Sequence, residues 1–181
     1  MKKFKLTSEF IVDISGVKLF RIKALIEFGN VKAGDLGGYI EKEENLSHMG
    51  DAWVSDDARI SGNAQVFGNA QVFGNAQVFG DAWVFGNAWV SGNARVFGDA
   101  QVSGDARVSG DKDYAYAHGF GSCNRTTTFF RIKDGDVGVR CGCFYGTLAQ
   151  FRDKVCETHG ETKKAQEYLM LADLMEIRFK N

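Results

Sequence analysis

The stretch that decides the fold covers residues 51–110 and reads DAWVSD-DARISG-NAQVFG-NAQVFG-NAQVFG-DAWVFG-NAWVSG-NARVFG-DAQVSG-DARVSG. It consists of ten hexads with no insertion between them. Alanine recurs at every sixth position from Ala52 to Ala106, and a β-branched residue follows two positions later. Glycine closes every hexad except the first, where Asp56 stands. A short period repeated this often predicts a repeat architecture.

The period has a direct structural interpretation. Alanine and the β-branched residue lie on the same side of an extended chain, so each hexad predicts a short strand with both facing inward. The Gly-Asn and Gly-Asp pairs between strands tolerate a positive φ, which lets the chain turn a corner. One hexad buries only a methyl group and a valine, so no rung is stable alone. We therefore expect a solenoid of stacked rungs that hydrogen-bond to one another.

The frame Ala-x-Val-x-Gly-Asn/Asp resembles the hexapeptide repeat of left-handed parallel β-helices. In that family three hexads make one triangular coil of eighteen residues, so the resemblance implies a mainly β fold with a left-handed-type parallel β-helix. The enzymes of that family usually place a small residue directly after the aliphatic one. Here phenylalanine takes that place in five hexads, which predicts a different corner geometry: Phe67, Phe73, Phe79, Phe85 and Phe97.

Residues eighteen apart would then lie one above another, about 4.8 Å apart. This spacing stacks Phe67 on Phe85 and Phe79 on Phe97, and it places Gln71 between two tryptophans. Outward aromatic stripes on a solenoid favour an interface. We predict self-association through Trp53, Phe67, Phe79, Trp83, Phe85, Trp89 and Phe97, with a homotrimer favoured because the β-helix resemblance implies one. The alternatives are packing of these rings within the chain and an aromatic platform for a ligand.

The segments on either side of the repeat predict two end modules. Residues 1–50 form a β cap, with a hairpin over residues 9–28 around Ser15-Gly16 that covers the first rung. Residues 29–50 contain Gly34, Gly37 and Gly38 and are predicted to be a loop that enters the first coil.

Residues 111–181 form a predicted ββαα module. Two strands, Thr126–Lys133 and Asp136–Cys143, are joined by the strong hairpin dipeptide Asp-Gly. Thr147-Leu-Ala-Gln150 fits a capping box that opens a first helix, and Gly160 ends it. A second helix is expected from about residue 162 to residue 178.

Both end modules also resemble segments of hexapeptide-repeat proteins from phages and prophages. The lead-in carries DLGGYIEKEENLS followed by GDAWV, and the C-terminal part carries HGFGSCNRTTTFFRIKDGDVGVRCGCF, then GTL, THG and EYL. Most proteins of that group have no assigned activity. The resemblance therefore implies a phage association but no mechanism.

A polar cluster after the repeat predicts an anion site. Glycines leave backbone N–H groups accessible, hydroxyls are numerous, and the guanidinium of Arg125 matches a phosphate or a carboxylate. Phe120, Phe144 or Tyr145 would be available to stack on a base. The alternative is a glycine-rich linker in which Arg125 is solvated. The predicted ligand-binding residues are His118, Ser122, Asn124, Arg125, Thr126, Arg131 and Arg140.

Metal binding and catalysis find less support. Cys141 and Cys143 would share one face of a strand, but zinc knuckles use longer spacers, so buried thiols are favoured over a metal. Acyl transfer, common among hexapeptide-repeat proteins, uses a histidine near a coil. Here the histidines, His48, His118 and His159, all lie outside the coils. No catalytic residue, cofactor or metal is predicted.

Composition narrows the function classes. A net charge of −1 excludes a dedicated duplex-DNA binder, and no apolar run reaches membrane-spanning length. The N-terminus lacks the apolar core of a signal peptide, and four cysteines do not form a secreted framework, so a cytoplasmic protein is expected. We predict a non-catalytic phage-type protein that binds a small anion, conceivably a nucleotide signal of host defence. A structural or adhesive phage component is the alternative, and an acyltransferase is the second.

Overall fold

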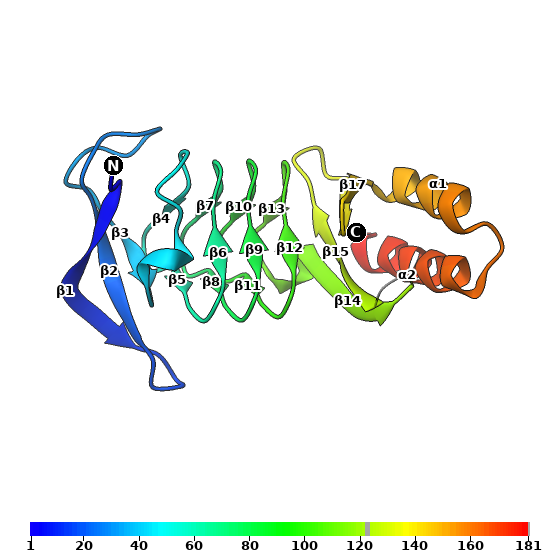
Figure 1. Cartoon of the computed structure of the whole chain (residues 1–181), viewed down its shortest axis with the longest axis horizontal. Helices are drawn as coiled ribbons and strands as arrows, with labels where there is room; N and C mark the ends of the chain where they lie inside the picture. The colour runs from blue at the N-terminus through cyan, green and yellow to red at the C-terminus, as the bar shows by residue number, and fades with distance from the viewer. Residues whose placement is uncertain (122–123, 181) are drawn as a thin grey trace.

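The computed structural model describes residues 1–121 and 124–180. A small N-terminal sheet, a β-solenoid and a C-terminal sheet with two helices follow one another along the long axis (Figure 1). The chain is thus mainly β, with stacked parallel coils, then strands and two C-terminal helices, as the sequence predicts.

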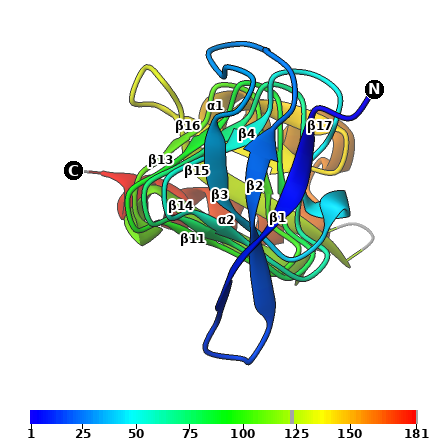
Figure 2. The ribbon, with the colours of Figure 1, turned by 90° about the vertical axis from the view of Figure 1, so that its left-hand side faces the viewer.

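The N-terminal cap is a three-stranded extension of one solenoid sheet. Strand β1 (Phe4–Val12) pairs antiparallel with β2 (Lys18–Ala24), which confirms the hairpin, although it starts earlier than predicted. Seen from the N-terminal end, the hairpin projects beyond the outline of the coils (Figure 2). Strand β3 (Leu36–Ile40) pairs antiparallel with β2 and parallel with the solenoid strand β5.

The predicted loop over residues 29–50 is wrong in part, because it contains β3 and the short 3-10 helix η1 (Glu43–Asn45). Gly37 and Gly38 serve close packing rather than a turn. A Cβ on Gly37 would collide with Ile22, and a Cβ on Gly38 would collide with Val54. The glycines therefore let β3 lie directly against the first coil.

The hexads form three parallel sheets with eighteen residues between neighbouring strands, which confirms three hexads per coil. The first sheet contains β4 (Trp53–Val54), β7 (Gln71–Val72), β10 (Trp89–Val90) and β13 (Arg107–Val108). The second continues the cap with β5 (Arg59–Ile60), β8 (Gln77–Val78) and β11 (Arg95–Val96). The third contains β6 (Gln65–Val66), β9 (Trp83–Val84) and β12 (Gln101–Val102).

The interior of the coils is the predicted one. Every alanine and every β-branched residue of the ten hexads is buried. The corner glycines adopt positive φ angles, for example 73° at Gly80, where another residue would be strained.

Side chains close both open ends of the solenoid, and their chemistry follows the direction of its hydrogen bonds. Each strand donates N–H groups to the next coil, as in the 3.0 Å bond from Trp53 N to Ala70 O. The first coil therefore presents carbonyl oxygens, and Lys3 and Asn45 donate to them. The last coil presents N–H groups, which the Asp111 carboxylate and the Thr128 hydroxyl accept.

The C-terminal module contains a four-stranded antiparallel sheet and two helices among its described residues. After the 3-10 helix η2 (Asp111–Asp113), the sheet order is β14 (Tyr114–Phe120), β15 (Arg125–Arg131), β16 (Val137–Cys141) and β17 (Phe144–Thr147). The predicted β15–β16 hairpin is confirmed. The predicted two strands and two helices are present, and two further strands, β14 and β17, flank that hairpin. The second predicted strand ends at Cys141, so Cys143 lies in the turn before β17.

The sheet separates two cores. On one face Phe130 packs into the solenoid core, and on the other Phe129 and Val139 pack against the helices. Helix α1 (Leu148–His159) begins at the predicted capping box and ends at Gly160, and α2 (Lys163–Phe179) follows. Successive side chains of a strand point to opposite faces of the sheet, so this arrangement determines which residues of β15 and β16 lie on the same side.

Candidate functional site

The arginines of the predicted anion cluster lie on different faces of the C-terminal sheet. Cross-strand partners on β15 and β16 are Thr127 with Cys141 and Thr128 with Arg140. Arg125 and Arg131 therefore share the helix-facing side of the sheet, whereas Arg140 lies on the side that faces the solenoid. Arg125 and Arg131 stand at opposite ends of β15. The three guanidinium groups do not converge on one ligand.

Two of these arginines already have partners in the chain. Arg131 donates to the carbonyl oxygen of Phe179 at 2.7 Å, and its guanidinium lies over the ring of the same residue. The Arg140 guanidinium lies 5.4 Å from the centre of the Phe85 ring. Both side chains thus contribute to packing between elements.

Two of the remaining predicted residues lie on paired strands, His118 on β14 and Thr126 on β15. His118 and Thr126 are joined by a 2.9 Å contact between Nδ1 and Oγ1, and the carboxylate of Asp99 lies 3.6 Å from the same ring nitrogen. Asn124 is exposed and has a φ of 46°. Ser122 lies outside the described residues.

Arg125 borders a cleft between the sheet and α1, with a volume of about 210 Å³. Phe144, Phe151 and Tyr168 supply aromatic walls, and their rings pack against one another. Lys154, which pairs with Glu157 at 2.9 Å, and His159 also line the cleft beside Arg125. The arrangement combines cations at a partly exposed mouth with an apolar interior, which suits a flat ligand that carries a negative charge.

Gly142 fixes the position of Arg125. It has a φ of 58° in the turn between β16 and β17, and a Cβ at this position would collide with the Arg125 guanidinium. The turn therefore leaves room for the guanidinium at the cleft.

Sequence reasoning identified Arg125 and Phe144 but missed Lys154 and Tyr168 as site residues. Phe151 and Val155 of α1 also line the cleft. The helical spacing from Phe151 to His159 was the available signal, because it places successive turns of α1 along one wall.

The outward aromatic side chains form the predicted columns. Phe67 stacks on Phe85 at 4.9 Å and Phe79 on Phe97 at 5.3 Å. Trp83 and Trp89 remain 41% and 46% exposed. Trp53 is the exception, since it is buried beneath Phe4 and Phe28 of the cap.

Part of the Phe79–Phe97 column packs within the chain. Phe97 makes edge contacts with Tyr114 and Tyr116 of β14, and Arg95 lies over Phe79. The more open rings of the columns are those of Trp83 and Trp89.

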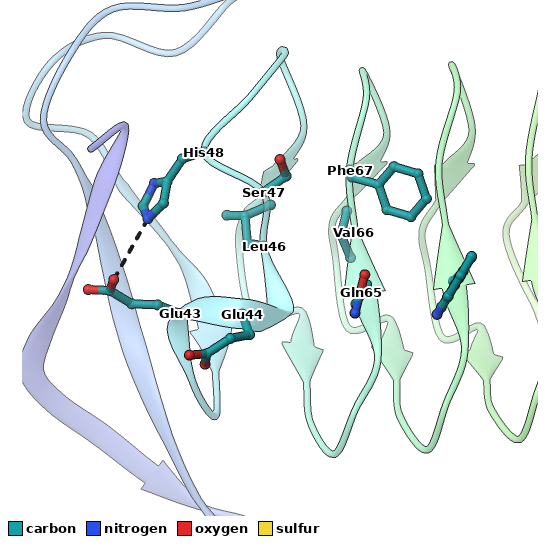
Figure 3. A pocket seen from close by; sticks show the side chains of 9 residues that line it. Glu43, Glu44, Leu46, Ser47, His48, Gln65, Val66 and Phe67 are labelled. Carbon is teal, nitrogen blue, oxygen red and sulfur yellow. Dashed lines mark ion pairs between the residues drawn. The ribbon is translucent and has the colours of Figure 1, made fainter. Parts of the chain in front are cut away.

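A third feature is a wide groove beside η1, of about 580 Å³ (Figure 3). Glu43, Ser47 and His48 form one side, and Phe67 and Trp83 of the coils form the other. The figure shows the His48 ring directed toward the Glu43 carboxylate, at 3.7 Å from Nε2.

His48 is not arranged as a general base. Its Nδ1 accepts a hydrogen bond from the Lys3 backbone N–H at 3.2 Å, so the proton of the neutral ring belongs on Nε2, which faces Glu43. A general base needs an unprotonated nitrogen directed at its substrate. Phe4 also stacks on the ring at 4.4 Å and holds it in place.

The cysteines do not form the buried set that was predicted. Cys141 is half-buried and accepts from the Thr127 hydroxyl at 3.2 Å, whereas Cys143 and Cys156 are exposed. Cys123 lies outside the described residues. Among residues 1–121 and 124–180, no three His, Cys, Asp or Glu side chains gather as a metal site requires. Within the same residues, neither helix has the length and hydrophobicity of a membrane span.

Comparison with known proteins supports the repeat architecture. The family model of the YdcK β-solenoid repeat matches residues 58–74, 76–92 and 100–111. The coils are similar to that repeat. The matched segments all belong to the hexads or to their last turn, so the likeness covers the solenoid and leaves both end modules outside it. No curated protein matches the chain.

Proposed function

We propose that this protein is a non-catalytic binding protein whose Arg125 cleft holds a small anionic ligand with a flat apolar part. The observation that carries the proposal is the juxtaposition of Arg125 and Lys154 with the rings of Phe144, Phe151 and Tyr168. A stacked β-solenoid suits such a role because it offers a rigid support for a site built at its end.

The dimensions of the cleft suggest how a nucleotide would sit. A volume of about 210 Å³ is below the range of about 300–1,000 Å³ that encloses a whole drug-sized ligand. One ring system would lie against the aromatic side chains. The charged remainder would stay at the mouth, where the Arg125 guanidinium can form two parallel hydrogen bonds to a phosphate.

The biological setting of this proposal rests on the sequence resemblance of the end modules to phage proteins. In that setting the ligand would be a nucleotide signal of host defence, and binding would remove it from its receptor. Sequestration needs affinity and no turnover.

The test is retention of nucleotides by the purified protein. We would incubate the protein with a nucleotide extract, wash it, release bound species by heat and identify them by mass spectrometry. The Arg125→Gln variant should retain at least tenfold less nucleotide than the wild type. Lys133→Gln, which removes an exposed lysine in the turn between β15 and β16, at the opposite end of β15 from Arg125, is the matched control. Equal retention by the Arg125→Gln variant, or no retained nucleotide, would overturn the proposal.

An assembly role is the second candidate function. The exposed Trp83 and Trp89 rings occupy two neighbouring sheets of the solenoid and support self-association through its outer surface. Such a protein would act as a structural or adhesive component.

A further inference from the structure

A separate groove lies at the other end of the molecule, between the tip of the β1–β2 hairpin and the outer face of the β5–β8–β11 sheet. Its volume is about 530 Å³, within the range of small-molecule sites. The groove exists because the hairpin projects beyond the coils (Figure 2). The sequence analysis did not predict this site.

The floor of the groove is a column of three outward side chains on successive rungs. Arg59, Gln77 and Arg95 lie one above another, as the parallel pairing of β5, β8 and β11 dictates. The two arginine Cα atoms are therefore about 10 Å apart, so both side chains can reach the middle rung. Among the described residues, neither guanidinium has an ion-pair or hydrogen-bond partner, and that of Arg95 lies 5.7 Å from the centre of the Phe79 ring. The floor thus presents two unneutralised cations around an amide.

Apolar side chains form part of the groove wall, beside Ser15 and Ser61. Ile14, at the hairpin tip, is fully exposed, and Leu19 and Phe79 line the same cavity. An apolar ligand that contacts these side chains gains stability because apolar surface is removed from water. Asp13 also lines the groove, but its Oδ1 already accepts from Ser15 N, Ser15 Oγ and Val17 N.

We propose that this groove binds a small amphipathic anion. Its carboxylate or phosphate group would lie above Gln77, between the guanidinium groups of Arg59 and Arg95. Its apolar part would extend along Phe79 to Ile14. Guanidinium groups match these anions because their planar N–H donors pair with two oxygens at once. The site is independent of the Arg125 cleft, which lies beyond the far end of the coils.

The experiment is calorimetric titration of the full-length protein with sodium octanoate. The Arg59→Gln and Arg95→Gln variants should each lower the affinity at least tenfold. These changes preserve the fold, because glutamine takes the same place in other hexads, such as that of Gln77. Arg107→Gln is the matched control, since Arg107 has the same place in its hexad but lies on another sheet.

A second variant tests the apolar wall. Ile14→Ser, at an exposed position, should weaken octanoate binding severalfold and leave the weaker binding of acetate unchanged. Octanoate binding that is undetectable, or equal in the Arg59→Gln/Arg95→Gln double variant, would overturn the proposal. Arg125→Gln should leave octanoate binding intact, so failure at one site is distinguishable from failure at the other.

Discussion

Lys3 Nζ donates a hydrogen bond of 2.8 Å to the carbonyl oxygen of Ala52, in the first hexad of the solenoid. A second bond of 3.2 Å reaches the carbonyl oxygen of Gly50. At this corner the ammonium group thus takes the place of the N–H groups that a preceding coil would supply. The side chain is buried and lies 4.6 Å from the centre of the Phe28 ring.

Replacing Lys3 by methionine should destabilise the protein. Methionine fills a similar volume but cannot donate, so the buried carbonyl oxygen of Ala52 and the part-buried one of Gly50 would lose this donor. An unsatisfied buried polar group costs about 1–3 kcal/mol, and we expect the free energy of unfolding in urea to fall by about that amount. Lys5→Met, at an exposed position of β1, is the control. A stability equal to that of the control would contradict the capping role.

The pH dependence of stability should carry a signature of the same lysine. Burial lowers the pKa of Lys3 from 10.5 to about 8, although Asp51 opposes the change. The unfolded chain therefore holds more protons than the folded chain between about pH 8 and pH 10.5. Over this interval the free energy of unfolding of the wild type should rise with pH relative to that of Lys3→Met. Parallel urea denaturation series would show it, and a constant difference between the two proteins would refute it.

Asp113 closes the opposite end of the solenoid. Its Oδ2 accepts from Ser109 N at 2.9 Å, Ser109 Oγ at 2.6 Å and Gly110 N at 3.1 Å. Asp113→Ala should cost about 1–3 kcal/mol of unfolding free energy and speed hydrogen exchange at the two amides. Lys112→Ala, at the exposed neighbouring position, should do neither. Unchanged exchange at Ser109 in the Asp113→Ala variant would argue against this cap.

The tryptophans supply a test of self-association. Changing Trp83 and Trp89 together to glutamine preserves the repeat, because glutamine has the same place in neighbouring hexads. We expect sedimentation velocity to show an oligomer for the wild type and a monomer for the double variant, with similar thermal unfolding. Gln65→Ala, on the strand that pairs with that of Trp83, is the control. A wild type that stays monomeric at tens of micromolar would refute an interface on these sheets.

The period of the repeat allowed more of the structure to be predicted than any short motif did. Eighteen-residue spacing was enough to predict that Phe67 would stack on Phe85, because parallel in-register rungs leave no freedom in which residues superpose. The buried residues of the coils could be predicted from the same period. The two end modules were harder, because each part of them occurs once.

Two misjudged segments show why. Gly37 and Gly38 suggested a loop, yet both are buried in β3. The strand lies so close to the first coil that there is no room for a side chain at either position. Strand β14 was missed although Tyr114 and Tyr116 alternate with alanines, a period-2 pattern that fits a half-buried strand.

The candidate site was predicted only in part for a similar reason. The chemistry of Arg125 was visible in the sequence, and so was a hairpin that contains Arg131 and Arg140. The register of that hairpin was not. It pairs Arg131 with Val137 and Arg140 with Thr128. The guanidinium groups of Arg131 and Arg140 therefore lie on opposite faces of the sheet. The spacing in α1 indicates which of its residues share a face, but which part of the sheet that face packs against depends on tertiary packing.

The number of hexads has a consequence for the relation between the two ends. Ten hexads complete three coils and begin a fourth, so β13 returns to the sheet of β4. Removing one hexad would rotate everything after it by a third of a turn about the solenoid axis, whereas removing three would leave the orientation unchanged and shorten the molecule by about 4.8 Å. The repeat count therefore sets the azimuth of the Arg125 cleft relative to the hairpin. Insertion of eighteen residues would lengthen the solenoid and keep the relative orientation of its two ends, whereas insertion of six would turn the Arg125 cleft to another side relative to the hairpin.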